Sequence, residues 1–204
     1  MYKGEKINSI THLVGASLSL VAWTLLVVFS SLTGDTLKII SCTIYGFTLF
    51  ILYLSSTLYH SFKGKAKRVF RFFDHSSIFL LIAGTYTPPA LVIIQGTMGW
   101  VIIGLVWGFA VVGIIFKSIW IDKFDLLSTF FYLLCGWTIL IDFKNFYQKF
   151  PTGGFVWLVI GGALYTIGAF FYAVDRIPRN HEIWHFFVLF ASTAHFFSIF
   201  FYVI

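Results

Sequence analysis

Charged residues are scarce in this chain of 204 residues. Aspartate, glutamate, lysine and arginine make up 11% of it, whereas 59% is hydrophobic. Because a water-soluble domain usually carries about 25% charged residues, the composition excludes an ordinary soluble protein. No long polar linker or low-complexity segment separates the hydrophobic runs. We therefore expect a multi-pass protein of the cell membrane, with residues 1–204 forming one integral membrane domain.

Cysteine is nearly absent. The two that occur, Cys42 and Cys135, lie inside apolar runs, which favours buried free thiols over a disulfide. The polar first nine residues precede an apolar run that is too long for a signal peptide, so we expect no cleaved signal. The formal net charge of +6 comes from short loops, which indicates an effect on membrane orientation rather than a nucleic-acid partner.

Long hydrophobic runs, in contrast, dominate the sequence. A transmembrane helix needs about 20 apolar residues, and the chain offers seven such segments. We expect an all-α, seven-transmembrane helix bundle with spans over residues 10–32, 37–61, 73–94, 98–119, 126–143, 155–174 and 181–204. Pro88-Pro89 predicts a kink near the end of the third span. Gly104-x-x-x-Gly108 in the fourth span would permit close contact with another helix.

The basic residues predict how the bundle is oriented. Of the 14 lysines and arginines, only Lys38, Lys144 and Lys149 lie on the side opposite the N-terminus. The other basic residues lie on the N-terminal side, five of them in one loop after the second span. Cytoplasmic loops of membrane proteins carry the excess of lysine and arginine. We therefore expect the N-terminus in the cytoplasm and the C-terminus outside.

Ionisable residues inside the spans suggest a metal site. His181 and His185 stand four residues apart at the start of the last span, so a helix would place them on one face, about 6 Å apart. Imidazole is the commonest protein ligand of zinc. The alternation of the spans puts His60 and Asp74 at the same depth, near the cytoplasmic boundary. Ionisable groups at membrane depth are costly and find partners, and one metal ion would satisfy several of them.

Each of these residues also has a simpler interpretation. Headgroup water could hydrate His181 and His185 at the start of their helix. His60 could simply end the second span, and Asp74 could cap the third. Ser56, one turn deeper than His60, could hydrogen bond to its own helix.

Three further histidines are interpreted as structural. We expect His75 to be a loop or packing residue that points away from Asp74. His195 lies about 15 Å along the helix axis from His185, too far for the same site, and is expected to form an interhelical hydrogen bond. His12, early in the first span, could contact the site from behind, but a structural role is favoured.

Four motifs, taken together, resemble the bacterial hemolysin III family. They are Asn8-Ser9-Ile10-Thr11-His12, Ser56-x-x-x-His60, Asp74-His75 followed by Ile82-Ala83-Gly84-Thr85-Tyr86-Thr87-Pro88, and Asp175-Arg176-Ile177-Pro178-x-Asn180-His181-x-x-x-His185. The resemblance covers nearly the whole chain. That family belongs with the progestin and adipoQ receptors and, more distantly, with the alkaline ceramidases.

The resemblance implies a zinc site and its residues. In the related proteins a seven-helix bundle holds zinc through three histidines, with an aspartate on the zinc-bound water and a serine nearby. The matching positions here are His60, His181 and His185 for zinc, Asp74 for the water and Ser56 for the serine. The receptor branch also carries a long soluble N-terminal segment, which these nine polar residues do not match, so a receptor for a protein hormone is not expected.

Such a site would suit hydrolysis. Three histidine nitrogens and one open position are typical of catalytic zinc, which activates water and polarises a carbonyl. Asp74 would accept the proton of the water, and Ser56 would stabilise the developing oxyanion. Membrane lipids would be the substrate or ligand, and we expect hydrolysis of a lipid amide or ester. The alternative hypothesis is a lytic, pore-forming or sensor-like membrane protein in which zinc is only structural.

Overall fold

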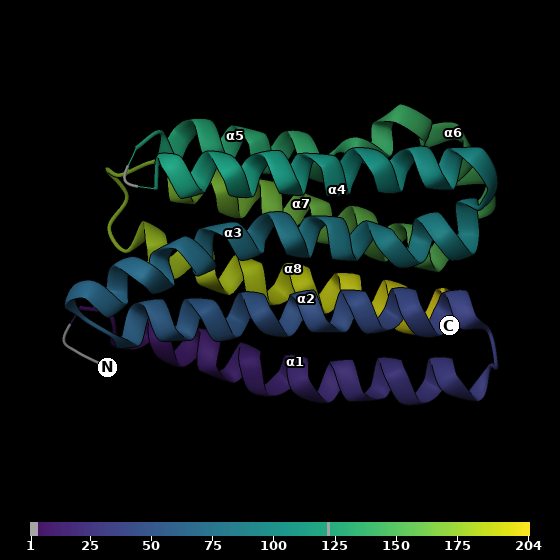
Figure 1. Ribbon diagram of the computed structural model, residues 1–204, viewed down its shortest axis with the longest axis horizontal. Helices are drawn as coiled ribbons and strands as arrows, with labels where there is room; N and C mark the ends of the chain where they lie inside the picture. Colours follow the sequence, from purple (N-terminus) through teal and green to yellow (C-terminus); the bar gives the residue numbers. More distant parts are fainter. Residues whose placement is uncertain (1–3, 122) are drawn as a thin grey trace.

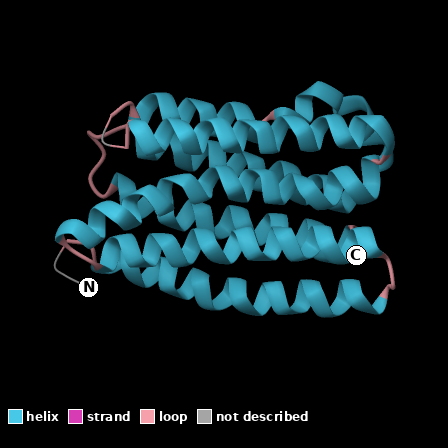
Figure 2. Ribbon diagram, in the orientation of Figure 1, coloured by secondary structure: helices cyan, strands magenta, loops and turns pink. Residues whose placement is uncertain are grey.

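The computed structural model describes residues 4–121 and 123–204, and the regular elements in these residues are all helical (Figures 1 and 2). The elements in chain order are α1 (Lys6–Leu32), α2 (Thr36–Ser61), α3 (Gly64–Pro88), a π-helix η1 (Pro89–Ile94), α4 (Gly96–Ile119), α5 (Asp125–Gly136), a 3₁₀ helix η2 (Thr138–Asp142), α6 (Phe143–Lys149), α7 (Thr152–Ala173) and α8 (Asn180–Tyr202).

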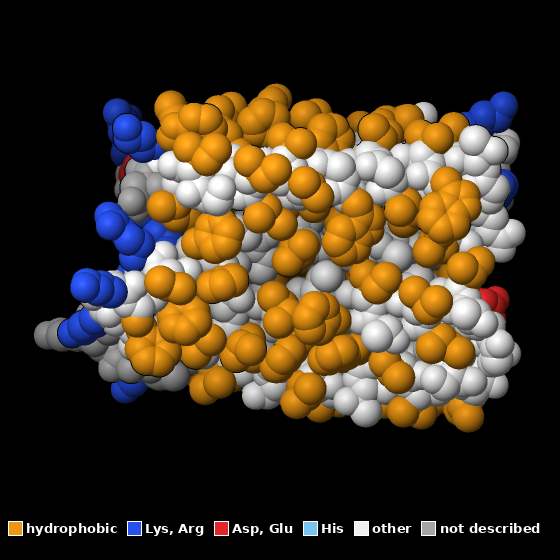
Figure 3. Space-filling model, in the orientation of Figure 1, with side chains coloured by type: hydrophobic (Ala, Val, Ile, Leu, Met, Phe, Trp, Pro, Cys, Tyr) orange, Lys and Arg blue, Asp and Glu red, His pale blue; other side chains and the backbone are white. Residues whose placement is uncertain are grey.

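Seven helical segments in the described part of the chain are long and apolar enough to cross a membrane. Large hydrophobic side chains cover the flank of the bundle, whereas lysines and arginines gather at its ends, most of them at the end that holds the N-terminus (Figure 3). The two termini lie at opposite ends of the bundle (Figure 1). An apolar flank between two charged ends matches a bilayer, and the predicted seven-helix membrane fold is confirmed.

The helices pack in an order that makes the first and last helices, α1 and α8, neighbours. α2 packs between α1 and α3, while α8 packs against both α7 and α1. The hydroxyl groups of Tyr53 in α2 and Ser192 in α8 are hydrogen bonded at 2.5 Å. Helices in a membrane associate through close packing and such interhelical hydrogen bonds, since lipid removes the hydrophobic drive. The end of α2 and the start of α8 therefore meet at the end of the bundle where the N-terminus lies (Figure 1).

The predicted helix boundaries agree with the structure except around three segments. The basic segment expected to be a loop after the second span is mostly helical, because α3 begins at Gly64. Gly64 has a φ of 61°, which glycine adopts without strain, so the chain can turn and start a new helix directly after Phe62-Lys63. Asp74 therefore lies well inside α3, and the interpretation of this residue as a helix cap is wrong.

The kink predicted at Pro88-Pro89 takes the form of a π-helix. Proline has no backbone N–H, so it cannot continue the hydrogen-bond ladder of an α-helix. The chain widens into η1, where the Gln95 amide donates to the Ala90 carbonyl at 2.9 Å. The turn that follows has positive φ angles of 58° at both Gln95 and Gly96.

The fifth span is broken where an unbroken helix over residues 126–143 was expected. α5 ends at Gly136, and the chain continues through η2 into α6. The Tyr86 hydroxyl donates to the Gly136 carbonyl at 2.6 Å and accepts from the Ile139 amide at 2.9 Å. A neighbouring helix thereby satisfies backbone groups that a break would leave bare in lipid.

The close helix contact expected at Gly104-x-x-x-Gly108 does not occur. Both glycines lie on an exposed face of α4, and no other part of the described chain lies within 4 Å of a Cβ built on either. Close approach occurs instead between α2 and α3, where a Cβ on Gly84 would lie 2.0 Å from the Thr48 hydroxyl oxygen. Glycine spacing within one helix does not reveal which face meets a partner.

Candidate metal centre

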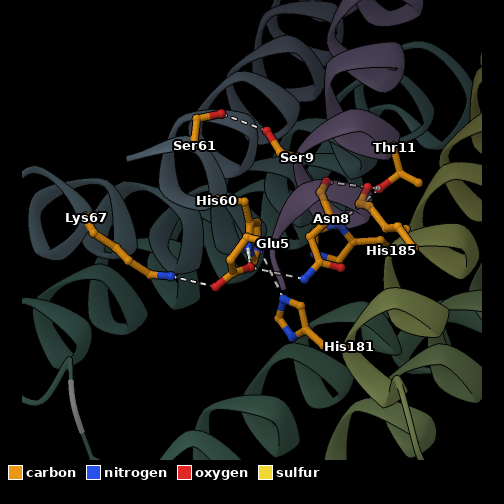
Figure 4. A network of polar contacts seen from close by, with 10 residues as sticks. Glu5, Asn8, Ser9, Thr11, His60, Ser61, Lys67, His181 and His185 are labelled. Carbon is orange, nitrogen blue, oxygen red and sulfur yellow. Dashed lines mark hydrogen bonds and ion pairs between the residues drawn. The ribbon is translucent and has the colours of Figure 1, made fainter. Parts of the chain in front are cut away.

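Three histidines from two helices converge at the end of the bundle that holds the N-terminus. His60 lies in the last turn of α2, and His181 and His185 lie in the first two turns of α8. One ring nitrogen from each lies within 4.8 Å of those of the other two, close enough to hold a metal ion. The Nε2 atoms of His60 and His181 are 3.2 Å apart (Figure 4). The structure therefore brings together the three histidines predicted as ligands.

Glu5 holds the ring of His60 from the N-terminal segment. Its carboxylate contacts His60 Nδ1 at 2.5 Å and the Lys67 ammonium at 2.6 Å, and it accepts from the Asn8 amide at 3.2 Å (Figure 4). Burial raises the pKa of the Glu5 carboxyl, but hydrogen bonds from Lys67, His60 and Asn8 outweigh it and lower that pKa to about 2. An ionised carboxylate only accepts, so His60 Nδ1 carries the proton and Nε2 presents its lone pair to the centre.

Sequence reasoning missed Glu5. A carboxylate behind a histidine commonly orients that ligand and raises its basicity in metal sites. The available signal was a single acid directly before the first span, in a segment whose other charges are Lys3 and Lys6. Lys3 lies outside the described residues. A lone charge of this kind does not indicate its partner, which here lies 55 positions along the chain.

His12 contacts the centre through His185. The two rings are stacked with centroids 3.6 Å apart, and the edge of the Tyr53 ring packs against His12 at 5.1 Å. The Thr11 hydroxyl lies 3.5 Å from His185 Nδ1 (Figure 4). His12 is 3% exposed. It lies directly behind the candidate ligand His185, which is the contact with the site that the sequence analysis allowed alongside a structural role. α1 thus supports the candidate ligands that come from α2 and α8.

Ser56 and Asp74 lie beside the histidines. The Ser56 side chain interacts with the Asp74 carboxylate, linking α2 to α3. Both residues line the same cavity as His181 and His185. This cavity has a volume of about 120 Å³, and much of its wall is apolar, including Leu52, Ile78, Leu81, Ile82, Leu133 and Val188. The predicted carboxylate and hydroxyl therefore line the same largely apolar cavity as His181 and His185.

Three other histidines, His12, His75 and His195, line this cavity. His195 donates from Nε2 to the Leu158 carbonyl at 3.2 Å, which confirms the expected interhelical hydrogen bond between α8 and α7. His75 was expected to be a loop or packing residue pointing away. It is buried within α3 and faces the cavity, with Nδ1 3.9 Å from an Asp125 carboxylate oxygen. His75 is therefore a packing residue of α3 and not part of a loop, but it does not point away from the cavity.

An ionic cluster on the α4 and α5 side of the cavity was also missed. Lys117 donates to Asp125 at 3.0 Å, and Arg71 donates to the same carboxylate at 3.2 Å. Lys117 was counted only as a charge at the end of a span. The signal available was its position inside the apolar run of the fourth span, where an ionisable residue requires a partner.

The donor set fits a transition-metal ion. The ligand atoms are three buried or half-buried imidazole nitrogens, which suit zinc and several other divalent metals. The Glu5 carboxylate fixes the protonation state of His60, as metal coordination requires. The cysteines do not contribute, since both are free and buried elsewhere. The fold and this cluster thus define a multi-pass, seven-helix membrane protein with a histidine site that could hold a metal ion.

Comparison with known proteins gives the family. The profile of the family described as "Haemolysin-III related" matches residues 1–196. The chain is 42% identical over 203 residues to Hemolysin-3 of Bacillus cereus, covering 99% of this chain and 93% of that one. It is 44% identical over 203 residues to the Hemolysin-3 homolog of Bacillus subtilis (strain 168), covering 99% and 95%. It is also similar to the human monocyte to macrophage differentiation factor, at 29% identity over 178 residues, covering 82% and 72%. The chain therefore belongs to the haemolysin III family.

Proposed function

We propose that this protein is a zinc-dependent hydrolase of a lipid amide or ester, with its active site near the cytoplasmic membrane face. One observation carries the proposal. His181 and His185 of the three-histidine cluster line a largely apolar cavity that is also lined by a carboxylate, Asp74, and a hydroxyl, Ser56. Three imidazole ligands leave a position open on a tetrahedral metal, which is the pattern of catalytic zinc.

His60, His181 and His185 would hold the ion in their neutral form. When bound, zinc supplies Lewis acidity, which favours ionisation of water near neutral pH and polarises a carbonyl. Asp74 takes the proton of the attacking water on its carboxylate and later delivers it to the leaving nitrogen or oxygen. A C–O bond forms at the acyl carbon, the C–N or C–O bond to the leaving group breaks, and the products are a fatty acid and an amine or alcohol.

The other residues of the cavity orient the reacting groups and exclude bulk water. The Ser56 hydroxyl donates to the Asp74 carboxylate and keeps it in the cavity. Once Asp74 has taken up the proton it can donate to Ser56 Oγ, which frees the serine hydroxyl to donate to the oxyanion that develops on the acyl oxygen. Leu52, Leu81 and Val188 form part of an apolar wall that accepts an acyl chain and excludes bulk water. A substrate that partitions into the bilayer would place its carbonyl at the depth of the histidines.

The test uses zinc-loaded protein in bilayers with ceramides, other N-acyl lipids and phospholipids, and follows the release of free fatty acid. Asp74→Asn should reduce turnover to the background while leaving zinc bound, because the substitution removes the base and keeps the ligands. Ser56→Ala should lower the rate by about 10²–10³ if Ser56 is an oxyanion donor. Asp35→Asn is the matched control, because Asp35 caps α2 at its other end and should leave turnover largely intact.

A second candidate function comes from the names of the Bacillus relatives. The Bacillus cereus protein is called Hemolysin-3, which suggests lysis of membranes. In that case the metal would only hold α2 and α8 together. If no lipid is hydrolysed above the Asp74→Asn background while the wild-type protein makes vesicles leak, the lytic function replaces the hydrolase.

A further inference from the structure

His195 lies where the cavity of the candidate site meets a second cavity. It is about 15 Å from His185 along the axis of α8. The second cavity has a volume of about 60 Å³ and continues along the apolar residues Pro89, Ile139, Phe146, Leu158 and Val159. We call the place where the two cavities meet the junction, and the residues that line both are Thr85, Tyr86, Gly136, Trp137, Gly162 and His195. The proposed reaction gives His195 no role.

One edge of the His195 ring is held against α7. Its Nε2 donates to the Leu158 carbonyl at 3.2 Å. A Cβ on Gly161 would collide with Cδ2 and Nε2 of the ring, so no space remains at that edge. Because a carbonyl only accepts, the proton of the neutral imidazole is on Nε2. The other nitrogen, Nδ1, therefore presents a lone pair away from α7.

His195 Nδ1 is an acceptor without a donor. Among the described residues, no group forms a hydrogen bond with it. The fully buried side-chain nitrogens that lack a hydrogen bond include both of His12 but not His195 Nδ1, so Nδ1 is open to the cavities that its ring lines. A polar atom that faces an apolar space costs free energy as long as no donor reaches it.

The other polar groups of the junction already have partners. The Thr85 and Tyr86 hydroxyls donate to backbone carbonyls at 2.7 and 2.6 Å. The Trp137 indole donates to the Thr166 hydroxyl at 3.2 Å. A buried water molecule typically makes about three hydrogen bonds, whereas the junction leaves one strong acceptor unfilled. A donor that a larger molecule carries into the junction needs only that one bond.

An uncharged hydroxyl is the donor that fits His195 Nδ1. An ammonium group would need an acid beside it, and the acids on the cavity wall, Asp74 and Asp125, interact with Ser56 and Lys117 instead. A carboxylate or phosphate would meet a lone pair and not a donor. Apolar side chains continue on both sides of the junction, toward the histidine cluster and toward α6 at the opposite end of the bundle (Figure 1). The hydroxyl would therefore lie along a hydrocarbon chain and not at its end.

We propose that His195 Nδ1 accepts a hydrogen bond from a hydroxyl group in the middle of a lipid chain, which runs from the histidine cluster through the junction into the second cavity. The ligand class is an acyl lipid that is hydroxylated at mid-chain. Faster hydrolysis of such lipids than of plain acyl lipids rests on the proposed hydrolase function, whereas the binding requires neither metal nor turnover. If His195 only joined α8 to α7, a hydroxyl on the bound chain would make no difference.

The experiment uses the full-length protein in bilayer discs and a stearate that carries a photoreactive diazirine on its chain. Mass spectrometry follows labelling of the peptides that line the two cavities. The competitors, compared at equal mole fraction in the bilayer, are stearate, its 9-, 10- and 12-hydroxy derivatives, 2-hydroxystearate, and the keto analogue of the best mid-chain alcohol. The best mid-chain alcohol should compete about threefold to tenfold better than stearate, the effect of one net hydrogen bond. The 2-hydroxy and keto compounds should equal stearate, because the first places its hydroxyl beside the head group and the second has no proton to donate.

His195→Phe keeps a ring in the junction without its nitrogens and should abolish the advantage of the alcohol. Tyr165→Phe is the matched control. The Tyr165 ring lies 5.5 Å from the His195 ring, but its hydroxyl is fully buried, so the advantage should be unchanged. A full advantage in folded His195→Phe overturns the proposal, and so does its loss in folded Tyr165→Phe. If His195→Phe does not fold, the wild-type protein decides: equal competition by the alcohol and its keto analogue, or by the alcohol and stearate, overturns the proposal.

The same measurement separates this proposal from the hydrolase. Asp74→Asn, which should lose turnover, should keep the advantage of the mid-chain alcohol. An advantage in binding without any lipid turnover by the wild-type protein supports the hydroxyl site and rejects the hydrolase. Turnover that is equally fast for hydroxylated and plain acyl lipids, with no advantage in binding, rejects the hydroxyl site alone.

Discussion

At the scale of residues, His60 shows how one candidate ligand depends on several segments of the chain. α2 carries it, Glu5 holds its Nδ1, and Lys67 of α3 holds the other oxygen of Glu5. The last helix supplies His181 on the other side of the ring. Because metal binding to such a site also stabilises the fold, each of these contacts should influence both metal affinity and stability.

Replacing any one of His60, His181 or His185 by alanine should lower zinc content from about one ion per chain and lower the melting temperature together. At a hundredfold excess over its dissociation constant, a ligand contributes about 2.7 kcal/mol. For a protein of this size, that corresponds to a decrease of about 5–10 °C in Tm. Metal analysis and thermal unfolding, with and without a chelator, provide the measurement. Full zinc content in His60→Ala would remove that residue from the ligand set.

Glu5→Ala should weaken zinc affinity by about 10- to 100-fold, the usual effect of losing a carboxylate behind a metal-binding histidine. Chelator competition gives the affinity, and the absorption spectrum of the Co²⁺-loaded protein reports the ligand geometry. Glu182→Gln is the control, since that carboxylate forms an ion pair with Arg179 at 3.8 Å. If Glu5→Ala and Glu182→Gln bind the metal equally well, Glu5 does not orient the ligand.

At the scale of elements, hydrophobicity predicted the seven spans well because lipid imposes one length and one composition on each of them. It failed where packing decides the conformation. The break after Gly136 depends on the Tyr86 hydroxyl of another helix, and the early start of α3 depends on a turn at Gly64. The i,i+4 spacing of His181 and His185 is a local signal and could be read directly. Glu5 and Lys117 are single charged residues, and the sequence does not show which residues they contact, because those contacts form only in the folded bundle.

Two glycine substitutions should separate a packed helix face from a lipid-facing one. Gly84→Ala would place a Cβ against Thr48, at a distance that real Cβ atoms do not adopt, so α2 and α3 must shift. Overpacking of this kind costs about 1–3 kcal/mol. Gly108→Ala meets no neighbouring atom among the described residues and should be neutral or slightly stabilising. Unfolding in detergent measures both, and equal stability of the two variants would contradict the packing of α2 on α3.

At the scale of the whole molecule, the basic residues lie mainly at the end of the bundle that holds the N-terminus (Figure 3). The histidine cluster lies at the same end, where α2 ends and α8 begins. Charge asymmetry of this kind sets orientation. We expect the N-terminus and the histidines at the cytoplasmic face and the C-terminus outside. A reporter fused after Ile204 should be active only in its extracytoplasmic form, and cytoplasmic reporter activity would place the site at the outer face.

The distribution of the histidines along the chain has a consequence for the synthesis and membrane insertion of the protein. His60 precedes His181 by 121 positions, and the other two candidate ligands belong to α8, which is translated after the other described helices. At about 5–20 residues per second, the ribosome adds His181 on the order of ten seconds after His60. A nascent chain that stops before α8 carries one of the three histidines. A metal ion held by all three could therefore bind only after α8 has been inserted, and its presence would distinguish chains that contain α8 from shorter ones.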